Sequence, residues 1–202
     1  AASFGPKPGP VSLVLPADSA WNEGGVAGAA VSRPSLRAPD TARIDKAAAA
    51  VKAAKTPVIL INGTALTEEG LSHAARLKAA GIRVTTATFF TRMARGAGRF
   101  APERMQYFAE GAMADLEGSD LMLIAGTDMP VAFFAYPEKP SVLVPEGCEM
   151  MSLGGAETDS AAVLAALADA LGATDRADVS PLEKPAAPSG ALSRRRRRRA
   201  RR

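Results

Sequence analysis

Residues 57–86 read PVILINGTALTEEGLSHAARLKAAGIRVTT, and the fold can be predicted from their pattern. The uninterrupted apolar run Val58-Ile59-Leu60-Ile61 predicts a strand that is buried on both faces. Residues 67–80 then have the period of a helix that ends at Gly81, and residues 82–86 predict a second strand. A strand, a helix and a strand in this order form a right-handed unit whose two strands are parallel.

The same alternation continues on both sides of this stretch. Asp40 and Thr41 can cap a helix that stops before Pro57, and its apolar positions 44, 47, 48 and 51 fall on one face. Downstream we expect a helix at about 103–116, strands at 121–124, 142–144 and 149–153, and a helix from Asp159 to Gly172. The pattern predicts a three-layer α/β/α fold: a Rossmann-like, doubly wound parallel sheet of five or six strands.

The two ends of the chain differ in composition from this predicted core. Residues 1–39 hold a short extended segment fenced by Pro10 and Pro16 and then a run rich in Gly, Ala and Pro, so we interpret them as the end of a preceding domain and a linker, loosely packed or extended. Residues 173–193 are rich in Pro and Ala and have no period, which is typical of a second linker. The predicted division is therefore 1–39, 40–172 and 173–202.

Charge is concentrated at the C-terminus. The net charge is +4, but residues 194–202 (RRRRRRARR) hold eight arginines, and the rest carries 17 Lys+Arg against 21 Asp+Glu. The predicted domain is thus mildly acidic and has no nucleic-acid footprint of its own. The tail is either a frameshift product, since serial GCC alanine codons read as CGC arginine codons in another frame, or a genuine nucleic-acid arm. As it stands, we expect it to be disordered by self-repulsion and to bind any polyanion in a salt-dependent way.

The composition places the chain among globular proteins. A hydrophobic content of 47% is sufficient for a core, and no apolar run approaches the ~20 residues that span a bilayer. The first ten residues lack the charged and apolar regions of a signal peptide, so we expect a cytoplasmic protein that does not contact a membrane. The single cysteine, Cys148, excludes an internal disulfide and is expected to be a small core thiol on a strand.

Ligands of open parallel sheets bind beyond the C-terminal ends of the strands. The candidate binding residues are therefore the polar and glycine positions of the loops there: Asn62, Gly63, Thr64, Thr86, Gly126 and Thr127. Gly63 and Gly126 would let the backbone approach a phosphate, and the helix beginning at Thr67 would offer N–H groups to it. Because the first loop is not Gly-x-Gly-x-x-Gly, the same glycines also fit ordinary turns, and both interpretations stay open.

Residues that could perform catalysis are scarce. His73 is the only histidine and lies within a predicted helix, so we expect a boundary residue, no catalytic triad and no metal site. Four arginines between the second strand and the next helix form either a basic patch that faces a phosphate or an acidic neighbouring domain, or a solvated face; they are Arg92, Arg95, Arg99 and Arg104. We assign no catalytic residue.

Several motifs in order resemble the central domain of thiamine-diphosphate-dependent enzymes of the acetolactate synthase large subunit and benzoylformate decarboxylase type. PVSLVLPAD at 10–18 resembles the end of their pyrimidine-binding domain, and AAKTPVILING at 53–63 resembles the first strand of their central domain. Residues 91–113 and 134–150 are similar to the segments after the second and third strands, and SDLMLIAGTDMP at 119–130 is similar to the third strand. The resemblance runs from about Gly9 to Gly172.

The resemblance implies a three-domain enzyme that acts on 2-oxo acids, with thiamine diphosphate between two subunits of a homodimer or tetramer. In that family the first domain supplies a glutamate, and the third supplies a Gly-Asp-Gly motif that holds Mg²⁺ and the diphosphate. This sequence has no Gly-Asp-Gly and begins after the expected glutamate, so the catalytic residues do not carry over and the fragment is expected to be inactive. Its partners would be the missing pyrimidine- and diphosphate-binding domains.

One cofactor distinguishes the two branches of the family. The central domain of acetolactate synthases binds FAD, and that of benzoylformate decarboxylases does not. The loops at Asn62-Gly63 and Gly126-Thr127 occupy the matching positions, whereas residues 92–108 are closer to the decarboxylase branch. The alternatives are a free-standing nucleotide-binding α/β module without catalysis and a nucleic-acid binder that uses its basic tail. The boundary motif at 9–18 favours the enzyme fragment.

Overall fold

The computed structural model describes residues 3, 9–32, 34–135, 137–175 and 179. A short helix, α1 (Ala17–Trp21), precedes the domain. The domain then follows in the order α2 (Thr41–Ala53), β1 (Pro57–Ile61), the 3₁₀ turn η2 (Gly63–Leu66), α3 (Glu68–Ala79), β2 (Arg83–Thr86), β3 (Glu103–Arg104), α4 (Ala109–Leu116), β4 (Leu121–Ala125), β5 (Glu149–Gly154) and α5 (Ser160–Ala170).

The five strands form one parallel sheet in the order β3-β2-β1-β4-β5. Ile59 at the centre of β1 pairs with Val84 of β2 on one side and with Leu123 of β4 on the other. The chain winds outward from β1 in one direction and from β4 in the other, so the switch point lies between these two strands. The predicted Rossmann-like parallel sheet is confirmed.

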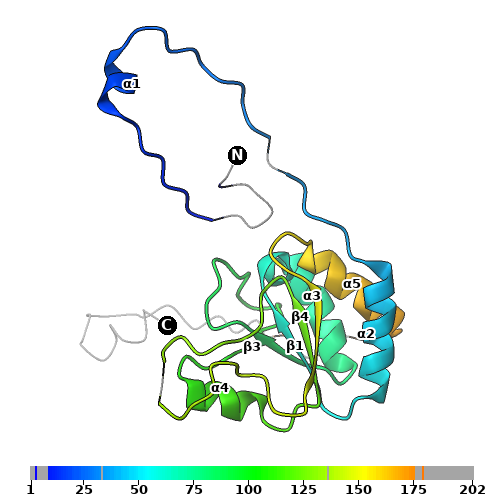
Figure 1. Cartoon of the computed structure of the whole chain (residues 1–202). Coiled ribbons are helices and arrows are strands. Elements are labelled where there is room, and N and C mark those ends of the chain that lie inside the picture. Colours follow the sequence, from blue (N-terminus) through cyan, green and yellow to red (C-terminus); the bar gives the residue numbers. More distant parts are fainter. Residues whose placement is uncertain (1–2, 4–8, 33, 136, 176–178, 180–202) are drawn as a thin grey trace, which may run out of the picture.

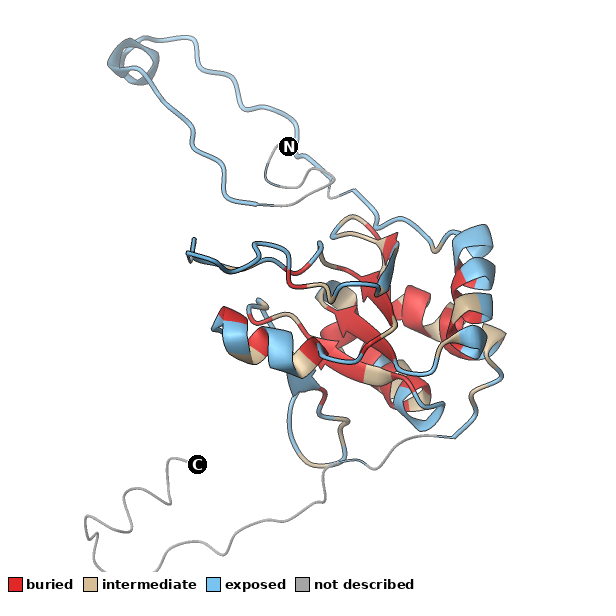
Figure 2. Cartoon of the chain, turned by 60° about the horizontal axis from the view of Figure 1, so that its bottom comes forward, coloured by how far each residue is buried: buried red, intermediate tan, exposed pale blue. Residues whose placement is uncertain are grey.

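The two faces of the sheet are covered unequally (Figures 1 and 2). Ile59, Ile61 and Leu123 belong to the larger core cluster, together with side chains of α2, α3 and α5. Val58 and Met122, which alternate with them along the strands, belong to a smaller cluster with α4. Every residue of β1 and β4 is buried, which explains why their sequences are apolar without alternation.

Side-chain caps fix where the helices begin. The carboxylate of Asp40 accepts from the backbone N–H of Arg43 at 3.2 Å, and the hydroxyl of Thr67 accepts from that of Gly70 at 3.2 Å. Asp159 accepts from the first amides of α5, with Ala161 N at 3.1 Å. Because each cap satisfies an amide that has no helical partner, the predicted starts of α2 and α5 are confirmed.

The predicted helix at 103–116 is wrong in its first half. Glu103 and Arg104 pair with Thr85 and Thr86 as the edge strand β3, and helix α4 begins only at Ala109. The amide of Met105 donates to the carbonyl of Thr86 at 3.1 Å, so the backbone here is used by the sheet. A helical period in the side chains could not reveal this use of the backbone.

The predicted strand at 142–144 is also wrong. Val142 makes one isolated antiparallel bridge with Val131, and Leu143 is buried beside α4. The segment is bracketed by Pro140 and Pro145, which lack the N–H that a ladder requires. Its apolar residues therefore cover the sheet as coil.

Cys148 does not lie on a strand. It precedes β5 in a turn, is half-buried, and packs at the margin of the smaller core cluster. Burial, with a smaller effect from Asp120, raises the pKa of its thiol. The expectation of a core thiol on a strand is thus corrected to a peripheral thiol, since the tight turn places residue 148 outside the ladder.

The described residues before the domain are exposed. Residues 9–32 extend away from it (Figure 1), and contact begins where Arg37 bridges the segment before α5: its amide donates to the carbonyl of Glu157 at 2.9 Å, and its carbonyl accepts from the amide of Asp159 at 2.9 Å. Within the described residues, none of the helices has the length and apolar character needed to cross a membrane. The polyarginine run lies outside the described residues.

Candidate functional site

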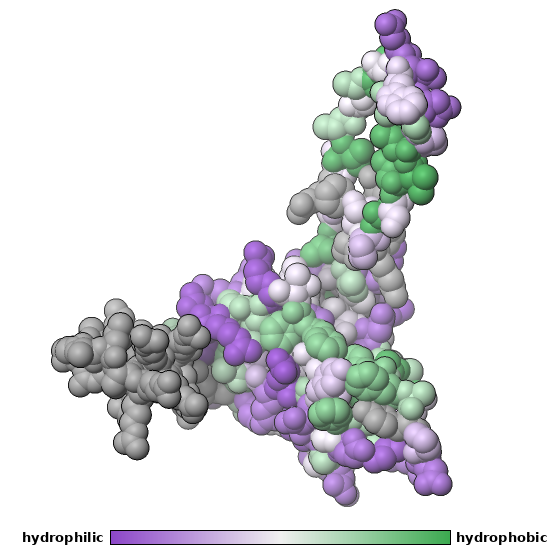
Figure 3. Space-filling model, turned by 90° about the vertical axis from the view of Figure 1, so that its left-hand side faces the viewer, coloured by the Kyte–Doolittle hydropathy of each residue, from purple (hydrophilic) through white to green (hydrophobic). Residues whose placement is uncertain are grey.

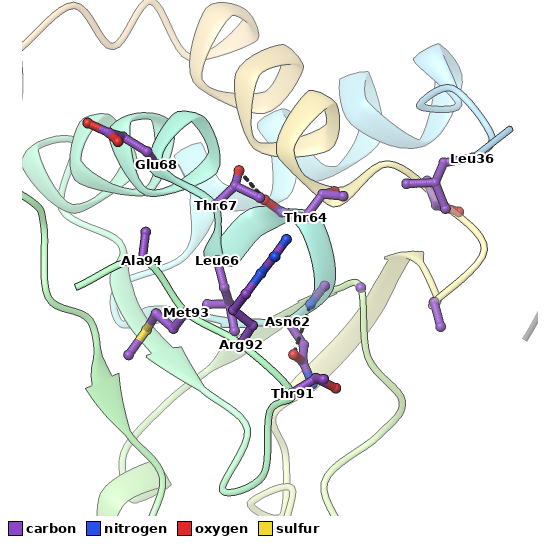
Figure 4. A pocket seen from close by; sticks show the side chains of 14 residues that line it. Leu36, Asn62, Thr64, Leu66, Thr67, Glu68, Thr91, Arg92, Met93 and Ala94 are labelled. Carbon is purple, nitrogen blue, oxygen red and sulfur yellow. Dashed lines mark hydrogen bonds between the residues drawn. The ribbon is translucent and has the colours of Figure 1, made fainter. Parts of the chain in front are cut away.

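A cleft of about 750 Å³ opens at the switch point between β1 and β4. Its walls come from the turn after β1, from residues 91–94 after β2, from the start of the loop after β4, and from residues 156 and 158 before α5 (Figure 4). Leu36 closes one side. This is the position at which doubly wound sheets hold their ligands.

The structure brings four of the six candidate residues into this cleft: Asn62, Gly63, Thr64 and Gly126. Thr127 instead lines a separate cavity of about 200 Å³ on the α4 side of the sheet. Thr86 is fully buried at the end of β2, and its hydroxyl has no hydrogen-bond partner among the described residues. The two loops that follow β1 and β4 therefore form the candidate site, with no contribution from Thr86.

The two glycines allow the loops to approach one another. Gly63 and Gly126 have φ angles of +67° and +73°, in the left-handed region that favours glycine. A Cβ at Gly126 would overlap the carbonyl oxygen of Asn62, and one at Gly63 would lie 3.2 Å from the Oγ of Ser160. The packing of the loops thus requires glycine at position 126, and at position 63 the left-handed backbone and the nearby Ser160 hydroxyl both favour it.

Ser160, at the start of α5, joins this arrangement and is not among the candidate residues predicted from the sequence. Its buried hydroxyl donates to the carbonyl of Asn62 at 2.7 Å and accepts from the amide of Ala65 at 2.8 Å. The neighbouring Thr64 hydroxyl donates to Asp159 at 2.7 Å. The available signal was the pair Asp159-Ser160 at a predicted helix start, but nothing in the sequence pairs a helix start with a turn almost one hundred residues earlier.

The backbone amides expected to face a phosphate already have acceptors. The amide of Gly63 donates to the side chain of Asn62 at 2.8 Å, and that of Gly126 donates to the carbonyl of Gly154 at 2.8 Å. The N-termini of α3 and α5 are capped by Thr67 and Asp159. These bonds favour the interpretation of the glycine loops as structural turns.

The four candidate arginines are distributed over different places. Arg92 lines the cleft, and its side chain extends toward Thr64 (Figure 4). Arg95 and Arg99 line a neighbouring cavity, and Arg99 pairs with Glu68 at 2.9 Å. Arg104 lies on the edge strand β3. Arg92 is therefore the only arginine of the four in the cleft, and it makes no ion pair with any residue in the described parts of the chain.

Titratable groups with shifted pKa values lie away from the cleft. Two backbone amides, those of Lys55 and Thr56, hold the pKa of Asp120 below its ordinary value, and the Lys139 ammonium does the same for Glu110. His73 is half-buried on α3, where its ring lies 3.2 Å from the Arg76 guanidinium. The site thus shows no acid–base pair of a catalytic kind among the described residues.

The residues do not fit thiamine diphosphate with Mg²⁺. That pair needs hard oxygen ligands for the metal. No group of three or more His, Cys, Asp or Glu side chains that could hold a metal occurs in the described parts of the chain. The cleft residues instead offer the Arg92 guanidinium, hydroxyls, apolar walls and one carboxylate, that of Glu68, which already pairs with Arg99. This lining suits an anionic ligand that is not coordinated to a metal.

Comparison with known proteins identifies one strong relative. The chain is 42% identical over 184 residues to "Putative acetolactate synthase large subunit IlvX" of Mycobacterium tuberculosis. The match covers 90% of this chain and 35% of the relative, so the chain spans about a third of that protein's length. No protein-family model matches the chain.

Solved structures with a similar arrangement include two decarboxylases. The benzoylformate decarboxylase of Polynucleobacter necessarius has a TM-score of 0.47 at 18% identity and covers 89% of this chain and 34% of its own. A thiamine diphosphate-dependent 4-hydroxybenzoylformate decarboxylase of Rhodococcus jostii RHA1 has a TM-score of 0.48 at 18% identity, and the match covers 87% of this chain and 35% of the decarboxylase. The identity with the Mycobacterium tuberculosis protein agrees with the motifs in the sequence, and it shows that this chain is similar to about a third of a protein of the acetolactate synthase large-subunit type.

Proposed function

We propose that this chain is the central domain of a cytoplasmic thiamine-diphosphate-dependent enzyme that acts on 2-oxo acids. In this role it connects the two catalytic domains, and its cleft binds an ADP-like group such as the adenosine diphosphate part of FAD. The complete enzyme would be a homodimer or tetramer. When bound between those other domains, thiamine diphosphate supplies carbanion stabilisation, and this chain supplies none of its ligands.

The cleft at the switch point, with Arg92 inside it, supports the binding part of the proposal. A guanidinium is a strong partner for a diphosphate because it donates several hydrogen bonds in a fixed geometry. The backbone amides around Gly63 and Gly126 are already used within the protein, so Arg92 is the group expected to bear the phosphate charge. The apolar side chains of Leu36 and Met93, which also line the cleft, would contact the adenosine.

Titration calorimetry of the purified chain with FAD and with ADP tests the proposal. We expect both to bind, and Arg92→Ala to weaken binding about ten- to a hundredfold, as the loss of a charge-assisted hydrogen bond predicts. Arg95→Ala is the matched control, because Arg95 is exposed, lies three residues away and does not line this cleft. Equal losses in the two variants, or no binding at millimolar ligand, would leave the domain a purely structural role.

A further inference from the structure

Five aromatic side chains form one exposed cluster on the α4 side of the sheet, which we call the aromatic surface. Its members are Phe89, Tyr107, Phe108, Phe133 and Phe134. Tyr107 lies at the centre, with the other four ring centroids 5.1 to 5.8 Å from its own. Phe89 and Phe108 are each 61% exposed, and the other three are between 36% and 47% exposed. The cluster holds half of the chain's ten aromatic residues, so it is not a scatter of single exposed rings.

The topology explains why these rings have no cover of their own. A doubly wound sheet ordinarily has helices on both faces. Here three helices cover one face, whereas the other has α4, with eight residues, and two long crossovers, 87–102 and 126–148, in which the described residues form no helix. Phe89 and Phe133 come from these crossovers. They form an outer layer over Leu60 and Met105, with which they line the small cavity on this face.

The surface is chemically suited to an apolar protein partner. Its five rings carry a single polar group, the Tyr107 hydroxyl, and the small cavity that Phe89 and Phe133 line has no arginine or lysine among its described lining residues. The Lys139 ammonium, which comes from the crossover after β4, already pairs with Glu110 of α4 at 2.5 Å. A nucleic acid would require cations at this place, whereas a packed protein interface is enriched in aromatic rings.

We propose that the aromatic surface is where the catalytic domains of the same enzyme dock onto this domain. The inference rests on the proposed function. The chain spans 35% of its relative's length, so roughly two thirds of such an enzyme lies outside the matched region and must pack against it. The N-terminal segment exposes further apolar side chains, with Leu13, Val14 and Trp21 each more than 80% exposed. Figure 3 shows apolar side chains both on the domain and along this segment, as expected of a unit partly enclosed by other domains.

The test compares the same substitutions in two settings. One is the purified chain alone. The other is a chimera in which this chain replaces the matched region of the full-length Mycobacterium tuberculosis relative. Phe89→Ser/Phe133→Ser removes two rings whose centroids are 5.0 Å apart. Met113→Ser/Met150→Ser is the control, because these side chains are 38% and 40% exposed and lie outside the aromatic surface. The measurements are the thermal melting temperature and the protection of aromatic side chains from hydroxyl-radical labelling.

We expect the aromatic rings to be protected in the chimera and labelled in the isolated chain. The Phe89→Ser/Phe133→Ser change should then lower the melting temperature of the chimera by several degrees more than that of the isolated chain, and the methionine control should show no such difference. Equal shifts in both settings would overturn the inference. So would a dimer of the isolated chain that these substitutions dissociate, because the occupant would then be a second copy. Binding of thiamine diphosphate by the unsubstituted chimera tests the proposed function separately, so a chimera that binds the cofactor with unprotected rings contradicts only the docking surface.

Discussion

Gly126 and Gly118 have nearly the same φ angle but different surroundings. Gly126 has a φ of +73° and meets the carbonyl of Asn62 and the hydroxyl of Ser160, whereas Gly118 has a φ of +74° and nothing within 4 Å of its Cβ position. The pair separates the cost of the left-handed conformation from the cost of steric overlap. Substituting each glycine in turn therefore tests whether the close contact between the loops after β1 and β4 requires a residue without a side chain.

We predict that Gly126→Ala destabilises the protein by about 3 kcal/mol or more, and Gly118→Ala by about 1 kcal/mol. Both variants place an alanine in the left-handed conformation. Only Gly126→Ala must also displace the Asn62 carbonyl, which is held by its hydrogen bond from Ser160. Urea unfolding followed by circular dichroism measures the two free energies. If the two substitutions lower the free energy of unfolding equally, the loops after β1 and β4 can move apart without cost, and their contact does not require glycine.

Much of the candidate site could be predicted from single residues, but its bonding could not. Asn62, Gly63, Thr64 and Gly126 follow apolar strands, and parallel topology alone places such positions at one edge of the sheet. Whether a glycine there serves a ligand or a neighbouring loop depends on what lies opposite. That neighbour is Ser160, which no local pattern connects to residue 62. Sequence alone is therefore compatible with both interpretations of the glycines, and the bonded amides favour the structural one.

At the scale of elements, Asp120 links the turn before β1 to the start of β4. One of its carboxylate oxygens accepts from the amide of Lys55 at 2.7 Å and the other from that of Thr56 at 2.9 Å. These bonds favour the charged form and hold the pKa of Asp120 below its ordinary value. A depressed pKa in the folded state means that the carboxylate stabilises the fold above the unfolded pKa, and that this contribution is lost as the pH falls through the folded pKa.

We predict that Asp120→Asn lowers the unfolding free energy at neutral pH and flattens its dependence on pH below about 4, near the ordinary aspartate pKa. The amide side chain keeps one acceptor and directs an N–H₂ group at a backbone donor. Chemical denaturation at a series of pH values measures the effect, with Glu117→Gln as the control for an exposed carboxylate in the same turn. If the unfolding free energy of Asp120→Asn depended on pH as steeply as that of the unchanged protein, the stabilising role of the Asp120 carboxylate would be contradicted.

The elements that were predicted correctly are those whose own side chains are buried in a regular pattern. Strands β1 and β4 are apolar throughout, and α2 and α5 begin at an aspartate cap. The errors fall where the backbone is governed by a distant partner. Glu103 and Arg104 became a strand because β2 presented a free edge, and the apolar residues at 142–144 remained coil between two prolines. Period and propensity do not report such partners.

At the scale of the whole molecule, we predict that the purified chain neither binds thiamine diphosphate with Mg²⁺ nor decarboxylates pyruvate or benzoylformate. Its sequence has no Gly-Asp-Gly, and the described residues offer no cluster of metal ligands. Calorimetry with the cofactor and the metal, alongside a decarboxylation assay, gives a direct answer. Micromolar binding or measurable turnover would show that the chain is more than a central domain.

The tail allows a separate prediction at the same scale. Eight arginines within nine residues attract any polyanion by releasing its counterions, so we expect binding to heparin and to unrelated DNA sequences alike, falling steeply with added salt. Removal of residues 194–202 should abolish it, because the remaining chain carries more acidic than basic residues. Sequence-selective binding that persists at moderate salt would instead identify the tail as a functional arm.

The hydroxyl of Ser160 also affects the order in which the protein is completed during synthesis. It bonds to Asn62 and Ala65, which precede it by 98 and 95 residues. At a translation rate of about 5–20 residues per second, the turn after the first strand leaves the ribosome roughly 5–20 s before its partner does. During this interval the carbonyl of Asn62 and the amide of Ala65 face water, and the larger core lacks its last helix. A nascent chain that stalls before residue 160 therefore exposes the apolar strands β1 and β4, and it becomes a substrate for chaperones and proteases.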